Sequence, residues 1–198
     1  RQMCIRDSHT ANDTQADGLT HSSIWCIVKD NQGTLWLGTY FGGVNYFNPE
    51  YEIYTRYSYS SNEKKGLSNP VVGRTIEDRD GNLWIGTEGG GLNYYNRRTR
   101  EFKWYRPQEG RNSISHNNVK ALYYDADKEI IWIGTHLGGL NKLDIRSGHF
   151  THYRMEEGNP NTLPSDIIRD IIPYKSLLII ATQNGVCLFD PANGQCQQ

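Results

Sequence analysis

A five-residue phrase recurs at nearly constant spacing along this chain, and it restricts the folds that the chain can adopt. The phrase reads Leu-Trp-Leu-Gly-Thr at Leu35–Thr39, recurs with one or two changes at Leu83–Thr87 and Ile131–Thr135, and survives in degenerate form at Leu178–Thr182. Its second residue lies at positions 36, 84, 132 and 179, which gives steps of 48, 48 and 47 residues. A period of about 40 to 50 residues is typical of propellers and solenoids. The chain is therefore interpreted as an array of four units.

Each unit contains four short β-rich segments separated by turn residues. In the second unit these segments are residues 71–78, 83–87, 92–95 and 101–105. No segment of the chain places apolar residues at helical spacing over ten or more positions, so a helical or leucine-rich solenoid fits poorly. We therefore predict an all-β fold, a β-propeller array of four-stranded antiparallel blades, with about four blades in this chain and more in a larger propeller.

Four long connections lead into the first strands and set the limits of the units. We predict an N-terminal non-repeat segment over residues 1–18, followed by blades over residues 19–66, 67–113, 114–162 and 163–198. In the fourth unit Ile179 replaces the tryptophan and Asn184–Gly185 replaces a Gly-Gly pair, and no clear fourth strand follows. We expect this last blade to be incomplete, with an exposed edge.

The repeated tryptophans are predicted to be scaffold and not a binding surface. Because neighbouring blades cover both faces of a propeller blade, Trp36, Trp84 and Trp132 are expected to pack between blades. The Gly-Thr and Gly-Gly elements are interpreted as close-packing and turn positions, because neither a helix nor a lysine–serine pair follows them.

Composition argues against several classes of partner. The formal net charge is -1, and the nearest approach to a basic stripe is Arg97–Arg100, at a predicted turn, so no nucleic acid is expected to bind. No stretch reaches the roughly 18 apolar residues of a membrane span, so no membrane contact is expected. Residues 1–8 match neither a signal peptide nor the repeat, and we treat them as foreign to the array.

The four cysteines, Cys4, Cys26, Cys187 and Cys196, form no CxxC pair. Neither a zinc site nor a thioredoxin-like motif is readable from them, and we expect no metal and no cofactor. A bridge between Cys187 and Cys196 is conceivable, but buried or idle thiols are the favoured interpretation.

The segment Val72–Asn93 resembles the repeat of the two-component regulator propeller family almost throughout, with a valine-led strand, an acidic turn, Gly-Asn-Leu-Trp-Ile-Gly-Thr, and then Gly-Gly-Leu-Asn. The resemblance covers residues 19–190. Family members are typically periplasmic sensor regions of hybrid histidine kinases. The resemblance therefore implies a carbohydrate-sensing domain that takes part in signal transduction through a phosphorelay, is periplasmic, and self-associates through its parent protein. Because no kinase is readable in these residues, we interpret the chain as a fragment of a longer protein.

The variable loops of the array are the candidate binding site. In a propeller the connections from second to third strand and from fourth to first strand share one face, and here they place different side chains on a constant frame. Aromatic rings together with amide, imidazole and guanidinium donors suit a sugar, so the predicted ligand is an oligosaccharide. The predicted ligand-binding residues are Tyr40, Phe41, Glu88, Arg106, His116, Asn117, His136, Gln183 and Asn184. His136 and Glu88 have no third metal ligand, so we predict no metal site.

We predict a non-catalytic sensor, and two alternatives stay open. A propeller glycosidase or lyase would need two carboxylates directed at one sugar bond, and only Glu88 and Asp166 are candidates near that face. The sialidase sequence box is absent, because Arg79 stands two residues before Gly81. The second alternative is a protein-interaction or dimerisation platform, which could coexist with sensing.

Overall fold

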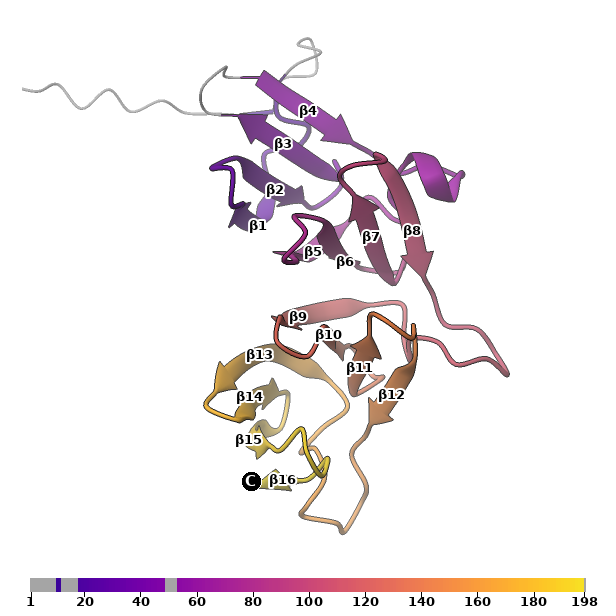
Figure 1. Ribbon diagram of the computed structural model, residues 1–198, viewed down its shortest axis with the longest axis vertical. Helices are drawn as coiled ribbons and strands as arrows, with labels where there is room; N and C mark the ends of the chain where they lie inside the picture. Colours follow the sequence, from indigo (N-terminus) through magenta and orange to yellow (C-terminus); the bar gives the residue numbers. More distant parts are fainter. Residues whose placement is uncertain (1–9, 12–17, 49–52, 198) are drawn as a thin grey trace, which may run out of the picture.

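The computed structural model describes residues 10–11, 18–48 and 53–197, and these residues form four four-stranded antiparallel sheets. In every sheet the strands lie side by side in chain order, so each sheet is one propeller blade (Figure 1). The predicted all-β fold with four-stranded blades is confirmed.

The strands follow the predicted period. Blade 1 comprises β1 (Ile24–Lys29), β2 (Leu35–Thr39), β3 (Val44–Asn48) and β4 (Ile53–Tyr57). Blade 2 comprises β5 (Val72–Glu77), β6 (Leu83–Thr87), β7 (Leu92–Asn96) and β8 (Glu101–Tyr105), and η1 (Glu63–Lys65) lies in the connection that leads to it. Blade 3 comprises β9 (Val119–Asp125), β10 (Ile130–Thr135), β11 (Leu140–Asp144) and β12 (Phe150–Tyr153). Blade 4 comprises β13 (Ile168–Tyr174), β14 (Leu177–Thr182), β15 (Gly185–Phe189) and β16 (Cys196–Gln197).

One detail of the last blade differs from expectation. We expected no clear fourth strand there, yet β16 pairs with β15 through Phe189 opposite Cys196 and Leu188 opposite Gln197. The turn residues before β16 allow this short return of the chain. The limits of the units within the connections stay predictions.

The first strands of the blades lie together on the inner side of the array, and the fourth strands lie outside (Figure 1). β1 contacts β5, β5 contacts β9, and β9 contacts β13, so consecutive blades pack through their first strands. At the two ends of the array, side chains such as Ile27 (63% exposed) and Val186 (58% exposed) lack a neighbouring blade within the described residues.

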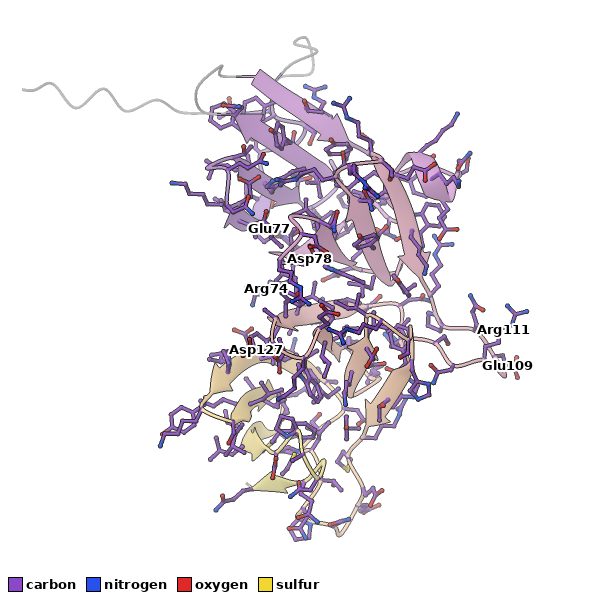
Figure 2. The ribbon with its side chains drawn as sticks, viewed as in Figure 1. Arg74, Glu77, Asp78, Glu109, Arg111 and Asp127 are labelled. Carbon is purple, nitrogen blue, oxygen red and sulfur yellow. The ribbon has the colours of Figure 1, made fainter. Side chains whose placement is uncertain are left out.

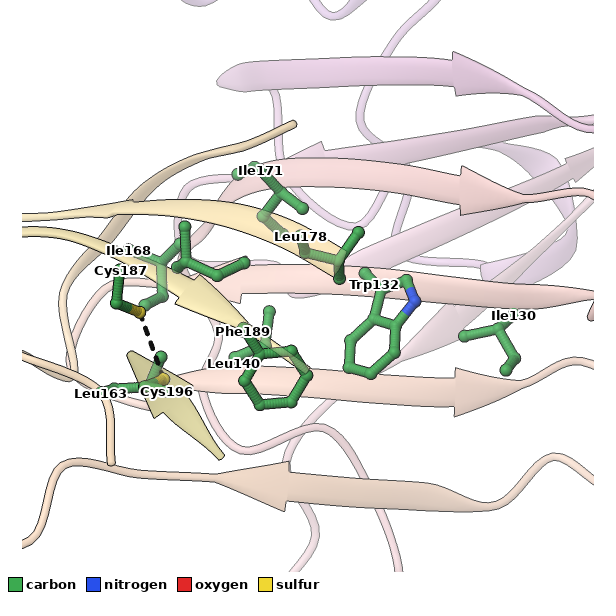
Figure 3. Packing of buried hydrophobic residues seen from close by; sticks show 12 residues of the cluster. Ile130, Trp132, Leu140, Leu163, Ile168, Ile171, Leu178, Cys187, Phe189 and Cys196 are labelled. Carbon is green, nitrogen blue, oxygen red and sulfur yellow. Dashed lines mark hydrogen bonds between the residues drawn. The ribbon is translucent and has the colours of Figure 1, made fainter. Parts of the chain in front are cut away.

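The hydrophobic core consists of the junctions between blades. Trp36, Trp84 and Trp132 are at most 2% exposed, and each belongs to a cluster that also contains residues of the following blade. At the last junction, Trp132 and Leu140 of blade 3 pack with Ile168 and Phe189 of blade 4 (Figure 3). The tryptophans are thus the packing residues that the repeat predicts.

An aspartate in the first turn holds the indole of the tryptophan. Asp30 accepts a hydrogen bond from Trp36 Nε1 at 2.8 Å, and Asp78 accepts one from Trp84 Nε1 at 3.1 Å. Asp125 starts the equivalent turn of blade 3, but that turn is one residue longer, and Trp132 Nε1 is buried without a partner. The hydrogen bond is present in the two blades where aspartate and tryptophan are six residues apart, and it is absent in blade 3, where they are seven residues apart.

The glycine of the repeated phrase permits the close approach of the next blade. A Cβ atom at Gly38, Gly86 or Gly134 would lie 2.5 to 2.7 Å from a side-chain carbon of the residue that opens the next first strand. Those opening residues are Val72, Val119 and Ile168. In blade 4 the register places Ala181 at this position, on a face that no further described blade covers.

A buried asparagine on the third strand holds the connection that enters each of the first three blades. Its side-chain oxygen accepts a backbone N–H bond from a Ser or Thr, and its amide donates to the hydroxyl of the same residue. We call this pair of hydrogen bonds the latch. The latch pairs are Asn45 with Thr20, Asn93 with Ser68, and Asn141 with Ser115. In blade 4 the register places Cys187 at the asparagine position, and Pro164 stands where the hydroxyl residue would be.

Candidate functional site

The second-to-third loop of each blade is tied to the start of that blade's own first strand. In every blade the first residue of this loop donates its backbone N–H to the carbonyl of the residue that immediately precedes the first strand. The bonds are Tyr40 to Ser23 (3.1 Å), Glu88 to Val71 (3.0 Å), His136 to Asn118 (3.0 Å) and Gln183 to Ile167 (2.9 Å). These four loop residues therefore lie at equivalent places on one face of the array, close to its inner strands.

The same loops are also tied to the next blade. Gly43 donates to the carbonyl of Pro70 at 3.0 Å, Gly91 to Asn117 at 2.7 Å, and Gly139 to Asp166 at 2.9 Å. All three glycines have φ between 70 and 80°, a conformation that a residue with a side chain rarely adopts, and their hydrogen bonds hold the loop backbone in place. The two kinds of connection thus form a constant backbone frame on this face.

A β-bulge at the start of each first strand adds a second variable position. The pairing register skips one residue between Ile24 and Cys26, between Val72 and Arg74, and between Ile168 and Asp170, and blade 3 shows the same shift. The residues left unpaired are Trp25, Gly73, Lys120 and Arg169. Because a bulge redirects its side chain, these positions can face the loop residues instead of following the strand alternation.

Bulge and loop side chains meet in pairs. The Trp25 ring stacks on the Tyr40 ring at a centroid distance of 4.9 Å. Lys120 forms an ion pair with Glu88 of the preceding blade, and Arg169 donates to the Gln183 side chain at 3.2 Å. We call the four bulge residues and the four first loop residues the mouth. Its chemistry differs from blade to blade, although its backbone does not.

Blade 1 gives the mouth an exposed aromatic patch. Trp25, Tyr40 and Phe41 are 44%, 38% and 58% exposed, and the rings of Tyr40 and Phe41 meet edge to face at 4.4 Å. The His21 ring approaches Tyr40 at 6.4 Å. Stacked aromatic faces with polar edges can contact both the apolar face and the hydroxyl groups of a sugar ring.

Blade 3 contributes two neighbouring imidazoles. The His116 and His136 rings lie 6.4 Å apart, and His116 Nδ1 lies 3.1 Å from the backbone N–H of Asn118, which donates to it. Burial, with the nearby His136 and Arg154, lowers the pKa of His116, so its imidazole is neutral near pH 7. His136 Nδ1 is buried without a partner. Within the described part of the chain, no three His, Cys, Asp or Glu residues gather as metal ligands.

Charged groups also meet on the inner side of the array. Arg74 of β5 forms an ion pair with Asp170 of β13 at 2.9 Å. The equivalent position of β9, in the blade between them, is occupied by Ala121. Figure 2 places Arg74 at the border between blades 2 and 3. This ion pair links two blades that are not neighbours.

The predicted site residues divide into two groups. Tyr40, Phe41, Glu88, His136 and Gln183 lie in or beside the mouth, and His116 lies next to His136. For the other three, the structure shows hydrogen bonds to the loop frame, while Asn117 and Asn184 are exposed. Arg106 donates to the carbonyls of Ser68 and Gly90, the Asn117 carbonyl accepts from two loop glycines, and the Asn184 N–H bonds to Thr182.

Sequence reasoning missed the bulge residues, Trp25 and Lys120 above all. A bulge adds one residue without changing the apolar character of a strand, so no single unit reveals it. Alignment of the four units does carry a signal. The second position of the first strand holds Trp, Gly, Lys and Arg in turn, which no packing position would tolerate.

The repeats match a known family. The two component regulator propeller family matches residues 18–41, 66–89 and 113–136, which include the loop residues Tyr40, Glu88 and His136. The chain carries two component regulator propeller repeats. The extracellular domain of a hybrid two component system from B. thetaiotaomicron is 26% identical to this propeller, with a TM-score of 0.79 over 91% of the chain and 25% of that domain. The recognition made from the sequence is confirmed.

Other solved structures share the propeller fold at lower identity. The extracellular domain of a one component system from B. thetaiotaomicron is 22% identical, with a TM-score of 0.73 over 89% of the chain and 25% of that domain. A catalytically inactive virginiamycin B lyase from Staphylococcus aureus is 13% identical, with a TM-score of 0.65 over 91% of the chain and 57% of that protein. This propeller spans about a quarter of the length of the two extracellular domains.

No curated protein matches the sequence. Among the residues described, no helix has the length and apolar character needed to cross a membrane. The chain is a propeller region of the two component regulator type, similar to extracellular domains of hybrid two component systems.

Proposed function

We propose that this propeller is a non-catalytic ligand sensor and that its mouth binds an oligosaccharide. In this proposal the chain is part of a hybrid sensor histidine kinase, lies in the periplasm, and passes the bound signal through the parent protein to a phosphorelay. The parent protein also supplies self-association. The similarity to extracellular domains of hybrid two component systems supports the setting, and the mouth supports the ligand class.

The observation that carries the proposal is the pairing of variable side chains on a constant frame. Each blade repeats the hydrogen bond from its loop to the start of its first strand, yet the mouth presents an aromatic stack in blade 1, a carboxylate in blade 2, an imidazole in blade 3 and an amide in blade 4. A scaffold role would favour the same side chain from blade to blade, as it does for the buried tryptophans of blades 1 to 3. Variation confined to the mouth favours recognition.

The carboxylates near the mouth support binding without catalysis. Glu88 is held by Lys120, and Asp166 pairs with Arg154 at 3.3 Å and accepts the backbone N–H of Met155 at 2.8 Å. A glycosidase needs two carboxyl groups that can both reach one sugar bond, and both of these carboxylates are instead engaged by groups of the protein. These contacts favour a binding role over glycoside cleavage.

The test measures binding and turnover together. Oligosaccharides are screened on an array, and hits are titrated by calorimetry with wild-type protein and with Trp25→Ala and Tyr40→Ala. Because each variant removes one ring of the aromatic stack, we expect about tenfold weaker binding. Tyr174→Ala is the matched control, since Tyr174 is 45% exposed at the far end of β13, and it should bind as wild type does.

Two outcomes contradict the proposal. If the wild-type protein releases a cleaved product and Glu88→Gln or Asp166→Asn does not, the propeller is an enzyme. Binding that is unchanged by both mouth variants but lost on substitution elsewhere would move the site away from the mouth.

A further inference from the structure

Two buried cysteines face each other in the outer half of blade 4. Cys187 on β15 and Cys196 on β16 are 1% and 4% exposed, and their sulfur atoms lie 3.1 Å apart (Figure 3). The register pairs Phe189 with Cys196, and Cys187 is two residues before Phe189, so both thiols lie on the same face of the sheet. A bond between them requires the sulfurs to approach by only about 1 Å.

Cys187 occupies the position that the latch asparagine has in the other three blades. Opposite Ile85 and Ile133 the third strand carries Asn93 and Asn141, and opposite Ile180 it carries Cys187. The partner position changes as well, because Pro164 has neither a backbone N–H nor a hydroxyl. Blade 4 has therefore lost both halves of the latch together.

Cys196 contacts the connection that the latch would have held. Its backbone N–H donates to the carbonyl of Asn161 at 2.8 Å, in the segment that leads into blade 4. A covalent link from Cys187 to Cys196 would thus join the third strand to the incoming connection through β16. That is the same pair of elements that the latch joins in blades 1 to 3.

We propose that Cys187 and Cys196 form a disulfide bond that replaces the latch in blade 4. The oxidant is an external disulfide, such as that of a periplasmic dithiol oxidase or of oxidised glutathione. The Cys187 thiolate attacks one sulfur of the oxidant and releases the other as a thiolate, and Cys196 then loses its proton and attacks Cys187 in the mixed disulfide. Two protein thiols are oxidised and one external disulfide is reduced to two thiols.

The order of attack follows from the contact between the sulfurs. The hydrogen bond with Cys196 lowers the pKa of Cys187, and the same bond raises the pKa of Cys196. Cys187 therefore ionises first. Because β16 contains two residues, local opening of this strand gives the oxidant access to the buried pair.

The first test counts thiols in the full chain. A Cys4→Ser, Cys26→Ser variant is incubated with reduced or oxidised glutathione, denatured, alkylated with N-ethylmaleimide and weighed by mass spectrometry. We expect two maleimide groups after reduction, and none after oxidation, with the loss of two hydrogen atoms. Two reactive thiols after oxidation, or a bond that joins two chains, would overturn the proposal.

The second test asks whether the bond performs the role of the latch. Oxidation should raise the thermal midpoint of the chain by several degrees. Pro164→Ser with Cys187→Asn rebuilds the latch and should show the higher midpoint in either redox condition. Cys26→Ser is the matched control, because Cys26 bonds to Thr75 in another blade and its loss should leave the redox difference intact. If the thermal midpoint of the rebuilt variant equals that of the reduced protein, the disulfide does not replace the latch. The thiol count is made on a chain that keeps Cys187 and Cys196, so it does not depend on how the rebuilt variant folds.

Discussion

Substitution of the latch asparagine in blade 2 gives the most direct test of how the blades are held. Asn93 is fully buried, accepts the backbone N–H of Ser68 at 2.8 Å, and donates to the Ser68 hydroxyl at 2.8 Å. Asn93→Ala leaves the Ser68 N–H buried without its acceptor, and it leaves the Ser68 hydroxyl with only the long contact to the Thr87 hydroxyl at 3.5 Å. Each unsatisfied group costs about 1 to 3 kcal/mol, so we expect a loss of about 2 to 4 kcal/mol in the free energy of unfolding.

A double-mutant cycle separates the latch from simple loss of volume. Ser68→Pro removes the N–H and the hydroxyl that Asn93 binds, and Pro164 at the equivalent position of blade 4 shows that this backbone accepts proline. In the Ser68→Pro background, Asn93→Ala no longer leaves a buried N–H without an acceptor, because proline has no N–H. The two substitutions should therefore be non-additive by about 1 to 2 kcal/mol.

The assay is urea unfolding followed by tryptophan fluorescence, supported by thermal midpoints. A loss of about 2 to 4 kcal/mol corresponds to roughly 4 to 16 °C in a chain of this size. Asn193→Ala, in an exposed turn, is the control and should change the midpoint little. If the two latch substitutions add to within about 0.5 kcal/mol, the asparagine does not act through Ser68 and the latch argument fails.

Three further predictions follow from the junctions, the turn aspartate and the mouth. Gly86→Ala places a Cβ atom 2.6 Å from a methyl carbon of the next blade, and it should cost about 1 to 3 kcal/mol in urea unfolding. Ala181→Gly, the control on the uncovered face, should cost at most about 1 kcal/mol, and equal losses would contradict close packing as the cause. Burial alone would raise the pKa of Asp30, but hydrogen bonds from Trp36, Thr34 and Arg97 outweigh burial and lower it. The stability that Asp30 contributes is therefore present above pH 3.8 and is lost as pH falls further, so Asp30→Asn should reduce the acid sensitivity of unfolding, and an unchanged acid midpoint would contradict this. Lys120→Met should release Glu88 and change ligand affinity at low salt more than at high salt, and a change independent of salt would argue against an electrostatic role.

The sequence predicts the blades well because the repeat supplies four readings of one structure. The segments expected at residues 83–87 and 101–105 coincide with β6 and β8. Turn residues and short apolar runs determine these strands locally, so neighbouring blades need not be known. The packing role of Trp84 follows in the same way. A large apolar residue recurs at this position in the first three units, and each of these units packs against a following blade.

The candidate site is less accessible to such reasoning, because it depends on register and on contacts between blades. Trp25 looks like a strand residue until the bulge at Ile24 and Cys26 is seen. Arg106 is predicted from the sequence as a ligand donor, and the structure adds that its guanidinium donates to two backbone carbonyls. Both features depend on pairing register or on contacts with parts of the chain that lie elsewhere in sequence, about which local propensity contains no information.

The contacts of the mouth differ in whether they lie within one blade or across the junction between two blades. Trp25 and Tyr40 meet within one blade, whereas Lys120 and Glu88 meet across the junction between blades 2 and 3. A ligand hydroxyl or charge that competes for Glu88 would weaken one contact at that junction, while a ring stacked on Trp25 would leave every junction contact in place. The same junction includes the buried Gly86 and Val119 contact, which leaves no free space to absorb a shift. A ligand that engaged both the aromatic patch and Glu88 would stack on rings of blade 1 and would compete with Lys120 for Glu88 at the junction of blades 2 and 3.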